Sequence, residues 1–65
     1  MRLSDLRERL TLSFGSDWAP SFCKDIALTE LGSKSVDESL KLGVEASDIW
    51  RAVCDAYPKE TAKYR

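Results

Sequence analysis

The sequence contains no histidine, and other residues that carry chemistry are scarce. Its 65 residues include two cysteines, three glycines and one methionine. Histidine is the side chain most often used for general acid–base catalysis, so its absence removes the commonest catalytic base. The carboxylates lie at positions predicted to face water, where a solvated charge is the usual role. We therefore expect no catalytic, cofactor-binding or metal-binding residues and no enzymatic activity.

Long apolar runs and glycine-rich loops are also missing. No stretch approaches the ~18–20 apolar residues that a membrane span needs, and no apolar signal stretch follows Met1. The glycines, Gly15, Gly32 and Gly43, lie between predicted helices and lack the spacing of a phosphate-binding loop. We expect a cytoplasmic protein with no membrane segment and no nucleotide cofactor.

Neither sign of charge dominates the chain. Ten Lys and Arg residues stand against eleven Asp and Glu residues, for a formal net charge of −1. Strong nucleic-acid binding needs clustered cations that displace counterions from phosphates. The balance of charge therefore disfavours nucleic acid as the partner.

Cys23 and Cys54 are enough for one disulfide at most. Because no export signal is visible, the reducing cytosol is the expected compartment, and thiols persist there. Both residues also lie among apolar neighbours on predicted helices. We expect two free thiols that behave as small buried hydrophobic side chains.

The strongest pattern that is present is helical, and it lies between Ala46 and Tyr57. Apolar residues recur there with the spacing of an amphipathic helix: Ala46, Ile49, Trp50, Val53, Cys54 and Tyr57. Pro58 cannot continue the helix because it has no N–H. We expect a helix that begins at Glu45 or Ser47 and ends at Tyr57.

Two further helices are predicted in the first half of the chain. One covers residues 4–14, with Ser4 as its N-cap and Gly15 after its end. The other begins at residue 17 or 18, after the capping residues Ser16 and Asp17, and continues to Leu31. Its apolar arc is wide, which is typical of a central helix covered on two sides.

A short helix over residues 36–42 completes the set. Ser35 and Glu38 have the spacing of a capping box, Leu40 and Leu42 are its main apolar residues, and Gly43 ends it. Together with the helix up to Tyr57 it has helix-turn-helix spacing. The positions that fit are the small or apolar residues and the turn glycine that such a pair requires: Ser39, Gly43, Val44, Ile49 and Ala52.

These elements predict an all-α protein, a compact bundle of about four short helices with a helix-turn-helix-like pair at residues 35–57. Residues 1–58 are expected to form a single domain, and residues 59–65 a flexible polar tail. A core this small leaves about 3–5 kcal/mol of stability. A second copy or another protein is therefore an expected partner.

The residues singled out for partner binding are Trp50, Arg51 and Trp18. Tryptophan and arginine are enriched in binding hot spots, although we favour core packing for both tryptophans. The function predicted is a non-enzymatic protein–protein interaction module. The alternative is a helix-turn-helix-like nucleic-acid-binding protein, which the acidic Glu45 and Asp48 at the start of the second helix oppose.

The chain resembles a family of short actinobacterial proteins known only as a domain of unknown function. The shared features are the Met1-Arg2-Leu3 start, Phe14-Gly15, Lys24-Asp25, residues 28–32, the Ser35-Val36-x-Glu38-x-Leu40 pattern, Gly43-Val44, and Ile49 to Asp55 with its Trp-Arg-Ala-x-Cys motif. The chain departs from the family pattern at Ile26, where many members have His, and at Glu45-Ala46, where Asp-Pro is common.

The resemblance implies a bacterial, cytoplasmic protein without an assigned activity. Genes of the family often lie near those of the recombinase of homologous recombination and its small regulator. That association links the nucleic-acid alternative to DNA recombination or repair, and it implies no catalytic residue.

Overall fold

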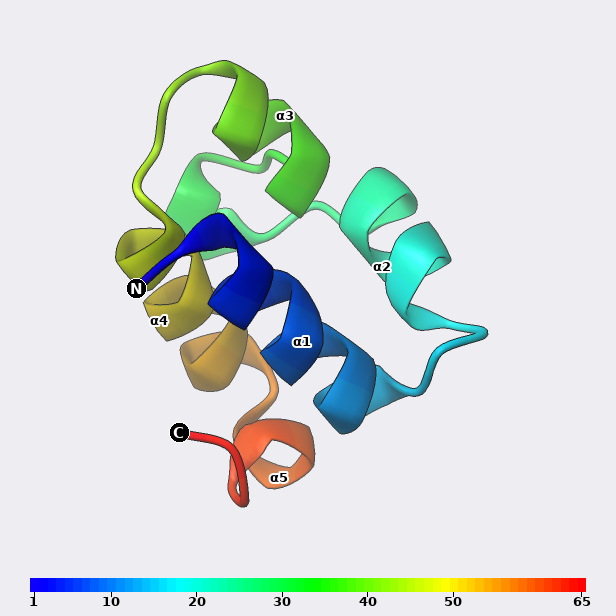
Figure 1. Cartoon of the computed structure of the whole chain (residues 1–65). Coiled ribbons are helices and arrows are strands. Elements are labelled where there is room, and N and C mark those ends of the chain that lie inside the picture. Colours follow the sequence, from blue (N-terminus) through cyan, green and yellow to red (C-terminus); the bar gives the residue numbers. More distant parts are fainter.

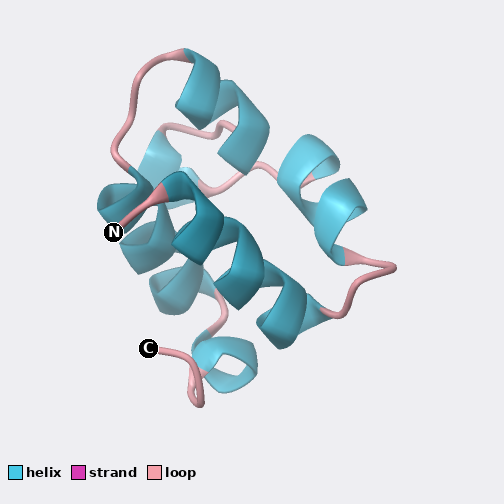
Figure 2. Ribbon diagram, viewed as in Figure 1, coloured by secondary structure: helices cyan, strands magenta, loops and turns pink.

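Six short helical segments make up the protein, and the computed structural model describes all of residues 1–65. They are α1 (Leu3–Phe14), α2 (Ala19–Asp25), the 3-10 turn η1 (Thr29–Leu31), α3 (Val36–Lys41), α4 (Ala46–Ala56) and α5 (Pro58–Thr61). Figure 1 shows α1 crossing the front of the molecule, with α4 behind it and α2 and α3 beside it. Figure 2 shows loops joining the helices and no strand, so the all-α prediction is confirmed.

Helix α1 begins one residue earlier than predicted, and Ser4 is not its cap. Arg2 is the N-cap, and its backbone N–H donates to the Asp5 carboxylate at 3.1 Å. An acidic side chain at this position also interacts favourably with the positive end of the helix dipole. Leu6 and Leu10 are buried in the core.

The predicted long second helix is wrong, because α2 contains only residues 19–25. Its C-cap Ile26 is extended, and the chain then folds back so that the Leu28 N–H donates to the Lys34 carbonyl at 3.0 Å. This turn buries Leu28 while Ala27 stays exposed. The bend after Ile26 therefore brings Leu28 into the core and leaves Ala27 in contact with solvent.

The helix-turn-helix-like pair of α3 and α4 is confirmed. Ser35 and Glu38 form the capping box: the Ser35 Oγ accepts from the Glu38 N–H at 3.1 Å, and the Ser35 N–H donates to Glu38 Oε1 at 3.2 Å. Gly43 has a φ of 85°, and the Val44 N–H donates to the Ser39 carbonyl at 3.0 Å. This is the Schellman arrangement that closes a helix with a left-handed residue.

The C-terminal residues differ from the expected polar tail. Pro58 opens α5, and Thr61 on it is fully buried, with its Oγ1 donating to the Tyr57 carbonyl at 2.8 Å. Helix α5 packs on α1 and α4, and Tyr64 lies against the core. The last residues therefore help to cover the core.

The core lies between α1, α2 and α4. Its buried apolar residues come from these helices and from the segments between them: Leu6, Leu10, Phe22, Cys23, Leu28, Val36, Ile49, Trp50, Ala52 and Val53. Phe14 stacks on Phe22 with ring centroids 4.2 Å apart, and Tyr57 meets both rings edge-on. None of the helices has the length and hydrophobicity needed to cross a lipid bilayer.

Candidate functional site

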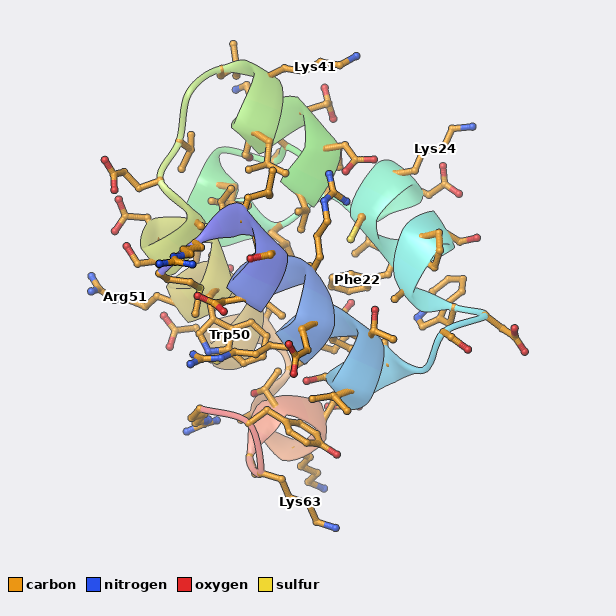
Figure 3. The ribbon with its side chains drawn as sticks, in the orientation of Figure 1. Phe22, Lys24, Lys41, Trp50, Arg51 and Lys63 are labelled. Carbon is orange, nitrogen blue, oxygen red and sulfur yellow. The ribbon has the colours of Figure 1, made fainter.

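Trp50 belongs to the core and does not offer a surface for a partner. Its side chain is 6% exposed. The Arg9 guanidinium on α1 lies over its ring, 5.9 Å from the ring centroid, in a cation–π contact. Figure 3 shows Trp50 between α1 and α4. The core packing that we favoured for this residue is what the structure shows.

Arg51 follows Trp50 but projects from a different face of α4, about 100° further around the helix axis. It is exposed and extends away from the body of the molecule in Figure 3. The other exposed residues of α4 include Asp48 and Asp55, and the N-cap Glu45 is exposed as well. The face that a helix-turn-helix protein would present to DNA therefore carries more acidic than basic groups, which repels phosphate.

Trp18 is the exposed tryptophan, with 48% of its surface accessible. It is the N-cap of α2, and its carbonyl accepts from the Phe22 N–H at 2.9 Å, so its backbone is held by the helix. The five other aromatic residues are buried or pack against the core. Trp18 is thus a large apolar side chain that a well-ordered backbone displays to solvent.

The structure does not bring the three predicted partner-binding residues together. In Figure 1 the turn between α1 and α2, which carries Trp18, lies at the right edge of the molecule, whereas α4 lies on the left. Trp50 and Arg51 adjoin in sequence, but the first is buried and the second exposed. The predicted Trp50–Arg51 patch is therefore not a continuous apolar surface.

Leu42 is another exposed apolar residue, and its predicted role was wrong. It was expected to be a main apolar contributor of the helix over residues 36–42, yet it is 65% exposed as the C-cap of α3. Met1, Leu3 and Leu12 are also about half exposed. These side chains supply further apolar surface at the ends and outer face of α1 and at the α3–α4 turn.

A groove between α1, α2 and α3 is a feature that the sequence analysis missed. It consists of two hollows that share Arg7 and Asp37 in their walls. The first hollow has a volume of about 230 Å³ and is also lined by Leu10, Thr11, Ala19, Pro20 and Cys23. The second is lined by Lys24, Ser35, Glu38, Leu40 and Lys41 as well. No spacing along the chain signals this groove, because its residues come from three separate helices.

Cys23 lies at the base of the first hollow, and its environment makes it a poor nucleophile. Burial, and then the nearby charge of Asp37, raise the pKa of the thiol, although Arg7 acts in the opposite direction. The thiolate is the reactive form, so a raised pKa lowers reactivity at neutral pH. Cys23 and Cys54 are both free, as the sequence predicts. No group of three or more Cys, Asp or Glu side chains is arranged to hold a metal ion.

Comparison with known proteins gives one family and no closer relative. No curated protein and no solved structure matches the chain. A family described as proteins of unknown function, DUF3046, matches residues 1–60, a range that includes α1 to α4 and the start of α5. The resemblance to a domain of unknown function is thereby confirmed. The chain belongs to the DUF3046 family.

Proposed function

We propose that this protein is a non-enzymatic interaction module that binds another protein through Trp18. One observation carries the proposal: Trp18 is half exposed, while every other aromatic side chain is buried or packed on the core. Folding normally covers such a side chain because its apolar surface is large. A partner that covers the ring would gain that burial without any rearrangement of the α2 backbone.

Trp18 replaces Trp50 as the anchor in this proposal. A hot-spot residue has to be accessible in the free protein and buried in the complex. Trp18 meets the first condition, whereas Trp50 is already buried in the core. Removing Trp50 would therefore test folding rather than partner binding.

The experiment compares capture by three forms of the protein from lysate of the source cells. Proteins retained by the wild type are quantified and then measured again with Trp18→Ala and with Leu42→Ala. Truncating a hot-spot side chain costs about 2 kcal/mol or more, or roughly 30-fold in affinity. We expect Trp18→Ala to lose the partner and Leu42→Ala, which removes a more exposed apolar side chain elsewhere, to keep it.

A second copy of the chain is the other occupant to be distinguished. Sedimentation equilibrium of the wild type and of Trp18→Ala separates the two cases, because self-association through Trp18 disappears in the variant. The proposal is contradicted when both forms are monomeric and capture the same proteins equally well.

The proposal has two further parts. The protein has no enzymatic role, and it is located in the bacterial cytoplasm. Support for the first comes from Cys23, whose raised pKa keeps its thiol protonated. Loss of a small-molecule substrate after incubation of cell extract with the purified protein, followed by mass spectrometry, would contradict it. Imaging of the tagged protein tests the location.

Nucleic-acid binding linked to recombination or repair is the second candidate. The Schellman turn at Gly43 and the buried Ser39, Ile49 and Ala52 support it, since this is how a helix-turn-helix pair packs. The exposed Glu45 and Asp48 oppose it. A mobility-shift titration at low salt decides: we expect no shift at micromolar protein, and a shift abolished by Arg51→Gln would favour this candidate instead.

A further inference from the structure

The groove between α1 and α3 exists because these two helices barely touch. Helix α1 packs against α2, α4 and α5, and α3 packs against α2 and α4. Arg7 on α1 and Asp37 on α3 come from the two sides of the gap, and both line each of its hollows. The groove is thus a product of the fold, and it is separate from the exposed Trp18 ring.

Positive charge gathers at the second hollow, against the overall charge of the chain. Arg7, Lys24 and Lys41 contribute one cation from each of three helices. Asp37 and Glu38 are its two carboxylates, and that of Glu38 already accepts the Ser35 N–H at 3.2 Å. Three cations therefore face two carboxylates, although the whole chain has a net charge of −1. A concave surface with an excess of one sign attracts ligands of the other.

The two lysines stand at the rim of this hollow. Figure 3 shows Lys24 on α2 and Lys41 on α3, both extending outward on the same side of the molecule. Their flexible side chains can turn toward a bound anion. The Arg7 guanidinium presents the planar fork that pairs with a carboxylate through two hydrogen bonds.

The first hollow shares Arg7 and Asp37 with the second, and its apolar residues are Leu10, Ala19, Pro20 and Cys23. Pro20 is the exposed one, and the other three are almost fully buried. Because burial raises the pKa of Cys23, its protonated thiol behaves as part of the apolar surface. A ligand that reaches from the second hollow into the first therefore meets an excess of positive charge at one end. At the other end it meets Pro20 and the balanced pair Arg7 and Asp37.

We infer that this groove binds a small amphiphilic monoanion, a carboxylate with an aliphatic tail. Arg7, Lys24 and Lys41 hold the carboxylate, and the tail lies against the exposed Pro20 and the accessible edges of Ala19 and Cys23. A single negative charge matches the excess of one cation, whereas a phosphate dianion would exceed it.

Octanoate is the probe that tests this inference, by titration into the isotope-labelled full chain followed by NMR. Saturable shifts are expected at the amides of Arg7, Cys23 and Asp37, with a Kd in the millimolar range or tighter. Octanol, which lacks the charge, and acetate, which lacks the tail, are expected to bind more weakly. Arg7→Gln removes the fork and should weaken octanoate binding about tenfold.

Lys59→Gln is the matched control, since it removes an exposed cation on α5, outside the groove. Its octanoate affinity should equal that of the wild type, and circular dichroism checks that both variants are folded. Unsaturable or scattered shifts, or equal losses in the two variants, would overturn the inference. Inorganic phosphate binding as tightly as octanoate would also overturn it, because the apolar hollow would then have no role. Trp18→Ala should leave octanoate binding intact, so this result is independent of the proposed protein partner.

Discussion

Residues 35–57 and residues 15–34 supply buried side chains to the same core but reach it by different routes. The first region consists of two helices joined by a closed turn at Gly43. The second contains a helix of seven residues, an extended link, a 3-10 turn and a bridge between Leu28 and Lys34. One region is regular and the other is bent around the core.

The two regions differ in what determines the backbone conformation. Local sequence signals determine it in one region, and the burial of apolar side chains determines it in the other. In residues 35–57 the capping box, the glycine and the amphipathic stripe all favour the same two helices. In residues 15–34 the helix has no side-chain cap, since Trp18 occupies the N-cap position. The chain there follows the burial of Phe22 and Leu28 instead. Tertiary burial can override helical periodicity when a straight helix would leave apolar residues outside.

The largest loss of unfolding free energy is expected for Leu28→Ala, in the bent region of residues 15–34. Leu28 is buried only because the chain turns back after Ile26, and a core Leu→Ala substitution costs about 2–5 kcal/mol. A loss of that size approaches the whole stability of a domain this small. Urea unfolding followed by circular dichroism measures it.

Ala27→Gln is the control for this substitution. Ala27 is exposed in the structure, so the change should stay within about 0.5 kcal/mol. Both residues would lie in the apolar arc of an uninterrupted helix. Similar losses at positions 27 and 28 would therefore contradict the bend and restore a long second helix.

The next largest loss of unfolding free energy is expected at two left-handed glycines, one in each region. Gly43 has a φ of 85° and Gly32 a φ of 71°, and a Cβ added at either meets no close contact. The cost of Gly→Ala is then conformational, about 1–2 kcal/mol for a left-handed residue. Chemical denaturation should give similar losses for Gly43→Ala and Gly32→Ala. A neutral Gly32→Ala would mean that the turn after η1 is not left-handed.

These residues also show how far the sequence predicts the fold. The helices around Gly43 follow from caps, glycine and periodicity, because such signals act over a few residues. The bend after Ile26 does not, since it depends on which side chains the rest of the molecule can cover. The packing of Thr61 on the core was also missed, because α5 is too short to show a pattern.

The candidate surfaces were predictable to a smaller extent. Trp18 was named from its residue type, but its exposure at the N-cap of α2 is a feature of the folded structure. Trp50 is buried within the core cluster and beneath Arg9, which lies on another helix. The groove depends on the separation of α1 from α3, which no sequence spacing encodes.

A smaller loss of unfolding free energy is expected when a helix cap is removed. Ser35→Ala removes the acceptor for the Glu38 N–H, and loss of such a cap costs about 1 kcal/mol. Asp17→Ala, at a residue predicted to cap the second helix, should cost almost nothing because α2 has no side-chain cap. Thermal unfolding of the two variants compares them. A loss at Asp17 equal to that at Ser35 would show that both helices are capped.

The smallest effect is a gain in unfolding free energy, and it is expected at Ser39, a buried residue of α3. Its hydroxyl is buried and has no hydrogen-bond partner. An unsatisfied buried hydroxyl is unfavourable, and alanine is also the better helix former. Ser39→Ala should therefore raise the unfolding free energy by about 0.5 kcal/mol.

Ser39→Val is the informative companion to that variant, because it separates polarity from size. Valine is larger than alanine, and overpacking a buried site costs about 1–3 kcal/mol. Urea unfolding should show a gain for alanine and a loss for valine. A loss for alanine would mean that the Ser39 hydroxyl makes a favourable interaction, and the regular region would then depend on more than its caps, its glycine and its apolar stripe.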